Sequence, residues 1–317
     1  MNNLIFSFNV IMPIFLVVFL GYFLRKINMI DDSFVNMAIK FNFRVGLATL
    51  LFKNIYTAKF SNVFNIKLIL FVFLCIIISI AALWLIVPMF IKDKKRISAM
   101  IHTIYRSNFV LLGIPLGINM FGQGHIASIA ILLPITIPTY NFFAVLILCA
   151  FGENENKNTI DKIKATAIGV IKNPLIIASF LGIIFQVSSI KLPIFIDRAV
   201  SDVASLGTPL ALVTLGAQFK FDSALKNLKY SIIATIGRLI LLPGIIIILA
   251  ILVGFRGYEL GAIFILFSAP SAVSSYVMAK EMNSDYELTG DVVLLTTFFS
   301  MFTIFAGIYM LKATSLI

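Results

Sequence analysis

Two clusters of polar, glycine and proline residues interrupt segments that are otherwise apolar. The first cluster contains Arg106, Asn108, Gly113 and Pro115, and the second contains Pro270, Ser271, Ser274 and Ser275. Proline lacks a backbone N–H and clashes with the carbonyl group four residues before it, so each proline is expected to open a helix and free backbone groups. Helix N-termini attract anions, because free N–H groups and roughly half a positive charge gather there. The two clusters therefore predict a binding site for an anion.

Asn108 and the serines are the side chains of these clusters that could contact such an anion. The amide of Asn108, a little over one helical turn before Gly113, offers a donor and an acceptor to a carboxylate. On a helix, Ser271 would share a face with Ser274 or Ser275. Structural roles are the alternative, because Asn forms hydrogen bonds between membrane helices and serine allows their close packing. The sequence leaves both interpretations open for each residue.

The composition of the chain indicates that both clusters lie in a membrane. Of its 317 residues, 60% are hydrophobic and 12% are charged, whereas soluble domains are about 45–50% apolar and about 25% charged. The net charge of +11 does not indicate nucleic-acid binding, because Lys and Arg lie mainly in short segments between apolar runs, where they set topology. We therefore expect a multi-pass protein of the cell membrane.

Ten transmembrane helices are predicted from the apolar runs. Their ranges are 6–24, 34–55, 67–91, 97–121, 125–150, 168–188, 197–219, 228–254, 258–280 and 288–311. With the N-terminus outside, the inner segments hold twice as many Lys and Arg residues as the outer ones, and inner loops of membrane proteins carry this excess. We therefore expect both termini outside and the polar linker of residues 151–167 in the cytoplasm.

The linker separates two five-helix halves, residues 1–150 and 168–317, that resemble each other. The matching segments are Pro13 and Phe19-Leu20-Gly21 with Pro174 and Phe180-Leu181-Gly182, Val45-Gly46 with Leu206-Gly207, and Pro115 with Pro270. Because each half has an odd number of spans, the second must be inverted relative to the first. The predicted fold class is an all-α membrane protein of two inverted repeats, with helix 4 broken at Gly113-Ile114-Pro115 and helix 9 broken around Pro270.

Interrupted helices at matching positions of inverted repeats are typical of secondary transporters, whose substrate lies near the bilayer midplane. Plain proline kinks are the structural alternative. The chain has no GxxxxGK[ST] phosphate loop, so ATP-driven transport by this chain alone is not expected. No metal or other cofactor is expected either, since His102 and His125 are far apart. A membrane-embedded lipid-modifying enzyme, which usually needs an acidic or His-based centre, and a passive anion channel are the alternative functions.

Four charged residues are predicted to lie inside spans or at their edges, where ionisable groups are costly and usually functional. They are Lys40, Arg44, Arg106 and Arg238. Lys40 and Arg106, near the inner ends of their helices, could instead extend to the cytoplasmic headgroups. This explanation is least suitable for Arg44, which is well inside the second predicted helix.

The segments around these residues resemble the auxin efflux carrier family, which includes plant auxin exporters and bacterial organic-acid permeases. The pattern Arg106-x-Asn108 with Gly113-Ile114-Pro115 looks like helix 4 of the bacterial members. SAPSAVSSYVMAKEM, residues 268–282, resembles helix 9 of the family, and SDVASLGTPLALVTLGAQF, residues 201–219, is similar to helix 7. The resemblance extends over nearly the whole chain except the linker.

The second helix resembles that of the plant members, with one departure. In FNFRVGLATLLFK, residues 41–53, Asn42, Arg44 and Lys53 stand in matching positions. Thr49 stands where the plant members carry an aspartate. The resemblance therefore does not extend to any coupling behaviour of that carboxylate.

The resemblance implies a ten-helix crossover fold with a scaffold from helices 1, 2, 6 and 7 and a mobile transport unit from helices 3–5 and 8–10. It also implies a homodimer, formed through the scaffold, and elevator-like movement. We expect transport of small organic anions, with a proton or a sodium ion as the coupling ion to be considered. The expected substrate contacts are Asn108, Gly113, Pro115, Pro270, Ser271, Ser274 and Ser275, with supporting or coupling roles for Arg44, Thr49, Lys53, Arg106 and Gln218.

Overall fold

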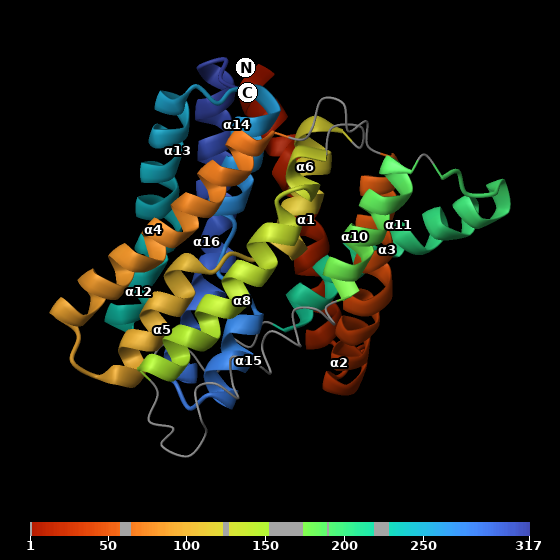
Figure 1. Ribbon diagram of the computed structural model, residues 1–317. Coiled ribbons are helices and arrows are strands. Elements are labelled where there is room, and N and C mark those ends of the chain that lie inside the picture. Colours follow the sequence, from red (N-terminus) through yellow and green to blue (C-terminus); the bar gives the residue numbers. More distant parts are fainter. Residues whose placement is uncertain (1, 58–64, 123–126, 152–173, 189, 219–227) are drawn as a thin grey trace. The chain divides into compact units, whose positions relative to one another are not determined.

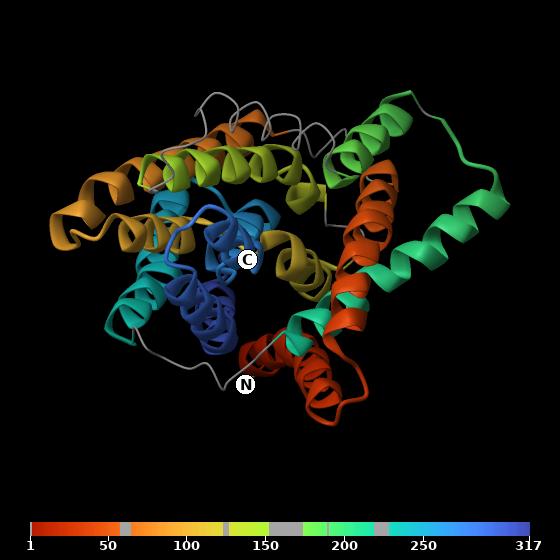
Figure 2. The ribbon, with the colours of Figure 1, turned by 90° about the horizontal axis from the view of Figure 1, so that it is seen from below.

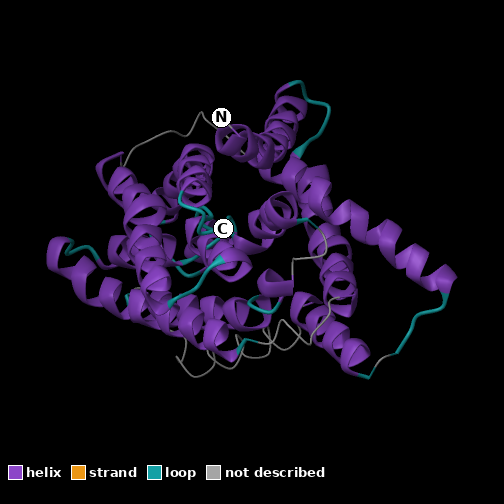
Figure 3. Cartoon of the chain, turned by 90° about the horizontal axis from the view of Figure 1, so that it is seen from above, coloured by secondary structure: helices purple, strands orange, loops and turns teal. Residues whose placement is uncertain are grey.

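The structure, a computed structural model, describes residues 2–57, 65–122, 127–151, 174–188, 190–218 and 228–317. Within these ranges every regular element is a helix, as Figure 3 shows. Residues 152–167 of the expected linker lie outside the described residues. Six described helices are long and apolar enough to cross a membrane: Asn3–Lys26, Ile66–Phe90, Ser128–Leu148, Ile194–Ala217, Leu228–Val253 and Tyr286–Ala313.

The chain forms two compact units, and neither unit is one half of the sequence. Unit 1 comprises Met1–Asn65, Val110–Pro134 and Ile171–Phe221, and unit 2 comprises Ile66–Phe109, Ile135–Val170 and Asp222–Ile317. Each unit therefore combines helices from before and after the expected linker.

Unit 1 contains the following helices, labelled in Figure 1: α1 (Asn2–Lys26), α2 (Asp32–Phe41), the π-helical turn η1 (Asn42–Gly46), α3 (Leu47–Thr57), α6 (Ile114–Phe121), α7 (Ala127–Ala130), α10 (Pro174–Val187) and α11 (Ile194–Ala217). The second predicted helix is thus a continuous run of α2, η1 and α3. Its first turn is capped by Asp31, whose carboxylate accepts a hydrogen bond from the N–H of Phe34 at 2.7 Å.

Glycines allow the helices of unit 1 to pack closely. Helix α1 packs on α11, α10 packs on α3, and α11 also crosses η1 and α3; Figure 2 shows α10 and α11, in green, beside α3. A Cβ atom on Gly216 would overlap the carbonyl oxygen of Val18, and one on Gly21 would overlap that of Val213. Small residues of this kind bring membrane helices together through backbone contact.

Unit 2 contains α4 (Ile66–Phe90), α5 (Lys94–Tyr105), most of α8 (Leu133–Ala150), α12 (Leu228–Ile236), the π-helical turn η6 (Gly237–Leu241), α13 (Leu242–Val253), α14 (Gly257–Ser268), α15 (Ser274–Glu281) and α16 (Tyr286–Ala313). Helices α5 and α14 form its core, because every residue of α5 from Ile97 and of α14 from Leu260 is buried. Helix α14 is apolar on nearly all sides, as is typical of a helix at the centre of a bundle, whereas α5 also buries Ser98, His102 and Thr103. With 12 residues each, both helices are about 18 Å long, which is too short for a hydrocarbon layer of about 30 Å.

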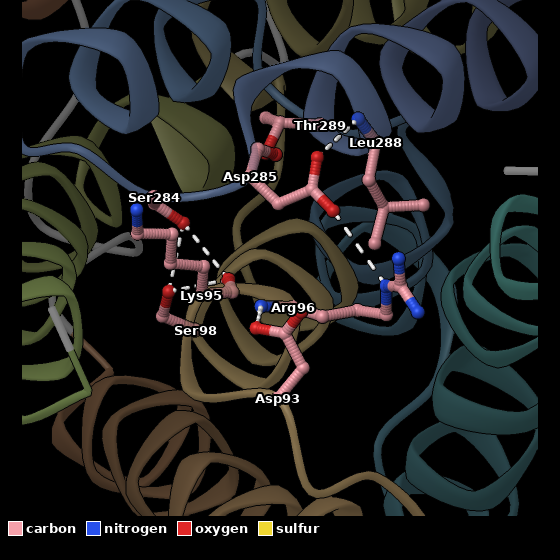
Figure 4. Close-up of polar contacts among 8 residues, drawn as sticks. All are labelled: Asp93, Lys95, Arg96, Ser98, Ser284, Asp285, Leu288 and Thr289. Carbon is pink, nitrogen blue, oxygen red and sulfur yellow. Dashed lines mark hydrogen bonds and ion pairs between the residues drawn. The ribbon is translucent and has the colours of Figure 1, made fainter. Parts of the chain in front are cut away.

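Polar contacts tie the start of α5 to the loop before α16 (Figure 4). The carbonyl oxygen of Lys95 accepts hydrogen bonds from the hydroxyl of Ser284 at 3.2 Å and from the N–H of Asp285 at 3.5 Å. The hydroxyls of Ser98 and Ser284 lie 2.7 Å apart, and Arg96 Nε lies 3.6 Å from the carboxylate of Asp285. The first part of helix 4 is therefore fixed to the loop between helices 9 and 10 within unit 2.

Helix 4 is not broken at Pro115, and this prediction was wrong. Pro115 is the second residue of α6, and a π-helical turn, η3 (Phe109–Gly113), precedes it in one helix that runs from Phe109 to Phe121. Pro243 in α13 likewise follows η6. In a π turn the hydrogen bonds span one more residue than in an α turn. We attribute the continuity to this wider turn, which accommodates a proline that would clash in a regular α-helix.

Candidate substrate site at the crossing of two interrupted helices

The interruptions of helices 4 and 9 lie directly after α5 and α14. Helix α5 ends at Tyr105, and Arg106 is extended with φ −80° and ψ 116°. Helix α14 ends at Ser268, and Ala269 before Pro270 is extended with φ −61° and ψ 147°. Because a residue before proline avoids the helical region, Pro270 accounts for the second interruption. The break predicted in helix 9 is therefore present.

The two extended segments pair with each other. Ser107 and Ser271 form an isolated antiparallel bridge. It is held by hydrogen bonds from the N–H of Asn108 to the carbonyl of Pro270 (2.8 Å) and from the N–H of Ala272 to the carbonyl of Arg106 (3.3 Å). Pairing satisfies backbone groups that could not remain free inside a membrane. The crossing is therefore a defined structure within unit 2.

The serines of the bridge cap the helix ends reciprocally. The hydroxyl of Ser107 donates to the carbonyl of Leu266 in the last turn of α14 at 2.6 Å. The hydroxyl of Ser271 donates to the carbonyl of Thr103 in the last turn of α5 at 2.5 Å. Ser271, expected to contact substrate, thus has its hydroxyl engaged by backbone. The expected helix face shared with Ser274 is absent, because α15 begins only at Ser274.

Removing the hydroxyl of Ser271 should destabilise the protein. Ser271→Ala leaves the buried carbonyl of Thr103 without this donor, and an unsatisfied buried carbonyl costs about 1–3 kcal/mol. Ser205→Ala is the control, because the exposed Ser205 donates to the carbonyl of Asp202 at 2.6 Å within its own helix, α11. Chemical unfolding of the purified variants should show a lower midpoint for Ser271→Ala only. Equal midpoints would contradict the reciprocal capping.

Arg106 places a buried positive charge beside the crossing. Its side chain is 6% exposed. Its guanidinium lies 2.7 Å from Asn141 Oδ1, 3.2 Å from Ser274 Oγ, 3.4 Å from His102 Nε2 and 3.0 Å from Met278 Sδ. Among the described residues, no Asp or Glu forms an ion pair with it. The side chain therefore does not extend to the headgroups, and no described carboxylate compensates its charge; a buried charge without a partner costs several kcal/mol.

Several buried polar atoms of unit 2 have no hydrogen-bond partner among the described residues. They include Asn108 Nδ2, Ser268 Oγ, Ser275 Oγ, Tyr140 Oη and His102 Nδ1. Buried polar groups are nearly always paired with protein, water or a ligand. The amide of Asn108, next to the bridge and 5% exposed, is therefore available as a donor to a bound molecule. With Arg106, it gives the crossing a positive charge and a free donor in apolar surroundings.

The remaining predicted residues lie in unit 1. Pro115 and Gly113 are buried there, Arg44 is exposed in η1, and Thr49 is half-buried in α3. Lys53 forms an ion pair with Asp197 in the first turn of α11. The lysine therefore has a carboxylate partner from helix 7, although Thr49 in its own helix is uncharged.

Gln218, the last predicted residue, has a partner in its own helix, since its amide donates to the carbonyl of Thr214 at 2.9 Å.

The backbones of helix 2 and α11 also approach each other closely where the two helices cross. A Cβ atom on Gly207 would lie 2.9 Å from the carbonyl oxygen of Gly46, and Asn42 Nδ2 donates to the carbonyl of Gly207 at 2.9 Å. The glycines that the sequence matched between the two halves thus meet.

Two residues of the crossing were missing from the predicted site. Asn141 in α8 accepts the shortest hydrogen bond of Arg106, and nothing in its apolar run distinguished it beforehand. Arg238 is completely buried and binds the ends of α5 and α14. The sequence did mark Arg238 as unusual, because it is a charge in a long apolar run. It did not indicate which segment the side chain would bind.

Comparison with known proteins agrees with a membrane-transport role. Residues 6–307 match the family described as membrane transport protein, which is the auxin efflux carrier family. An uncharacterized transporter of Methanocaldococcus jannaschii is 23% identical over 308 residues, which cover 93% of this chain and 96% of that protein. An uncharacterized transporter of Methanothermobacter thermautotrophicus is 22% identical over 301 residues, covering 93% and 95% of the two chains. These relatives are transporters rather than enzymes. The chain therefore belongs to the membrane transport protein family, the auxin efflux carriers.

Proposed function

We propose that this chain is a secondary transporter of small organic anions, carboxylates in particular, which bind at the crossing. The observation that carries the proposal is the buried guanidinium of Arg106, whose described partners are all uncharged. A carboxylate would balance this charge and accept charge-assisted hydrogen bonds from Arg106 and Asn108. Binding at the ends of broken helices near mid-membrane is also the arrangement found in many secondary transporters.

The inverted repeat is supported by contacts that occur in matching pairs between the two halves of the chain. Helix α1 packs on α11 as α10 packs on α3, which pairs helix 1 with helix 7 and helix 6 with helix 2. Gly46 meets Gly207, and the serines of the crossing cap each other's helices. Each of these relations is what an axis of pseudo-symmetry within a unit would produce.

The division into two units supports a scaffold and a transport unit. Unit 1 holds helices 1, 2, 6 and 7 with the second part of helix 4 and the start of helix 5, and unit 2 holds helices 3, 8, 9 and 10 with the first part of helix 4 and most of helix 5. We propose that the second unit carries the anion by an elevator-like movement and that the scaffold forms a homodimer. The excess of Lys and Arg in the inner segments supports external termini and a cytoplasmic linker.

Uptake into proteoliposomes tests the proposed function. Radiolabelled lactate, succinate and malate represent mono- and dicarboxylates, and proton and sodium gradients are set independently. We expect uptake of at least one acid that saturates with concentration, because an alternating-access site becomes occupied. A flux that rises linearly with concentration would instead indicate a passive channel.

Asn108→Ala should weaken carboxylate binding without unfolding the protein. The variant loses a hydrogen bond to a charged group worth about 1.5–3 kcal/mol, so affinity should fall roughly tenfold or more. The ranking among acids should also change, since only some acids would use the lost amide. Asn119→Ala is the matched control, because Asn119 lies in α6 and donates to the carbonyl of Val10 at 2.8 Å. Wild-type affinity in Asn108→Ala would place the site elsewhere.

A further inference from the structure

The side chain of Arg238 is bound by backbone carbonyl groups. It comes from η6 and is 0% exposed. Its guanidinium gives five hydrogen bonds, to the carbonyl oxygens of Ile104 (3.2 Å), Tyr105 (3.2 Å), Leu266 (3.4 Å) and Ala269 (2.6 and 2.9 Å). A guanidinium has five N–H groups, so its capacity as a donor is fully used.

These carbonyl groups mark the C-terminal ends of two helices. Ile104 and Tyr105 are the last residues of α5, Leu266 lies in the last turn of α14, and Ala269 is the C-cap of α14. The end of a helix carries roughly half a negative charge on carbonyls that lack a partner. Two ends therefore sum to roughly one negative charge. The single positive charge of Arg238 balances them, and no described Asp or Glu forms an ion pair with it.

Every carbonyl group at the end of α5 already accepts a hydrogen bond. Its last four carbonyl groups accept hydrogen bonds as follows: His102 from the N–H of Arg106 (3.2 Å), Thr103 from the hydroxyl of Ser271 (2.5 Å), and Ile104 and Tyr105 from Arg238 (3.2 Å each). The same groups, in other transporters with broken helices, coordinate the coupling Na⁺. A guanidinium and a sodium ion both bind carbonyl oxygens, so Arg238 competes with Na⁺ for those of Ile104 and Tyr105.

We infer that Arg238 is a permanent cation in the place of a coupling Na⁺ at the crossing. Arginine stays protonated in proteins, so this charge is present at every step of the transport cycle. The crossing is therefore assembled for its anion without Na⁺. The inference rests on the proposed function in treating the crossing as the transport site.

Replacing Na⁺ tests the inference on the unaltered protein. Thermal unfolding of the purified wild type and its uptake of carboxylates are measured in sodium chloride and in choline chloride of equal ionic strength. We expect the same unfolding temperature and the same uptake rate in both salts. A higher unfolding temperature in sodium chloride, or uptake that requires Na⁺, would overturn the inference. If no carboxylate is transported at all, the proposed function fails, while the unfolding comparison still decides the inference.

Arg238→Ala tests the cation site directly. The variant leaves the carbonyl groups of both helix ends unpaired, so we expect a lower unfolding temperature and at least about a tenfold loss of uptake. Added methylguanidinium, which restores the missing group, should raise the unfolding temperature and recover part of the uptake. A folded Arg238→Ala protein that transports like wild type, or that methylguanidinium does not stabilise, would overturn the inference.

Two further variants control this experiment. Arg256→Ala is matched, because Arg256 also donates to backbone carbonyls, that of Ile251 in the last turn of α13 (2.9 Å) and that of Phe255 (2.6 Å), but is exposed. Methylguanidinium should leave it unchanged. Arg238→Lys retains a positive charge with three donors, so it should be more stable and more active than Arg238→Ala. If Arg238→Ala does not fold, Arg238→Lys is compared with wild type instead. A Lys variant that unfolds at a lower temperature and transports more slowly than wild type, because it has fewer donors for the carbonyl groups, would support the inference. A Lys variant as stable and as active as wild type would contradict it.

Discussion

Arg106→Gln should remove most of the anion affinity of the crossing while leaving the free protein at least as stable as wild type. The substitution deletes two or more charge-assisted hydrogen bonds, each worth about 1.5–3 kcal/mol, so affinity should fall roughly a hundredfold or more. Stability should not fall in parallel, because a buried charge without a charged partner is costly and its removal is often neutral or favourable. Arg106 would then be a residue that reduces stability in favour of binding.

Equilibrium binding of a radiolabelled carboxylate and thermal unfolding without it measure the two effects separately. Arg106→Lys keeps the charge but not the planar set of donors, so its affinity should be intermediate. Arg198→Gln removes an exposed arginine of unit 1 and should bind like wild type. If Arg106→Gln loses stability and retains affinity, Arg106 serves the packing of α5 rather than the anion.

Gly216→Ala should prevent unit 1 from forming its native packing. The added methyl group would overlap the carbonyl oxygen of Val18, a backbone atom that cannot move without shifting α1. Overpacking a close contact costs about 1–3 kcal/mol, and more where backbone must move. We therefore expect a marked decrease in the yield of folded protein and in its unfolding temperature.

Gly244→Ala is the matched control for this substitution. Gly244 lies in α13, and no described atom lies within 4 Å of the position of an added Cβ. Alanine is favoured over glycine in a helix by roughly 1 kcal/mol. The control should therefore be as stable as wild type or more stable. Size-exclusion chromatography and thermal unfolding compare the pair, and equal stability of the two variants would show that α1 and α11 do not pack through Gly216.

Proline predicted the interruption of helix 9 but not that of helix 4. Pro270 has a local effect on the residue before it, and the break follows from the sequence alone. In helix 4 the unwound residues are Arg106, Ser107 and Asn108, none of which breaks a helix by itself. They are extended because they pair with the segment around Pro270, and pairing between distant segments is not visible in local sequence. The only local indication of this interruption was that Arg106, Ser107 and Asn108 are three consecutive polar residues next to an apolar run.

The residues that bind the buried charges could not be predicted from the sequence either. Arg106 and Arg238 were recognised as charges inside spans or at their edges, because each stands within or beside an apolar run. Which groups they bind depends on how α8, α12, η6 and α14 pack around α5, and apolar helices of similar length carry little information about their neighbours. The ion pair of Lys53 with Asp197 could not be predicted for the same reason, because the two residues belong to different halves of the chain.

The π-helical turn before Pro115 has a mechanical consequence. The chain passes from unit 2 to unit 1 between Phe109 and Val110, so this junction lies inside the turn Phe109–Gly113 rather than in a loop. Hinges are often short stretches at the ends of elements, and π turns are less regular than the α-helix around them. In the proposed elevator-like movement, we expect a shift between π and α hydrogen bonding in this turn to let α6 stay with unit 1 while the bridge at Ser107 moves with unit 2. In that case Pro115 would act by keeping one turn of helix 4 compliant rather than by exposing a binding site.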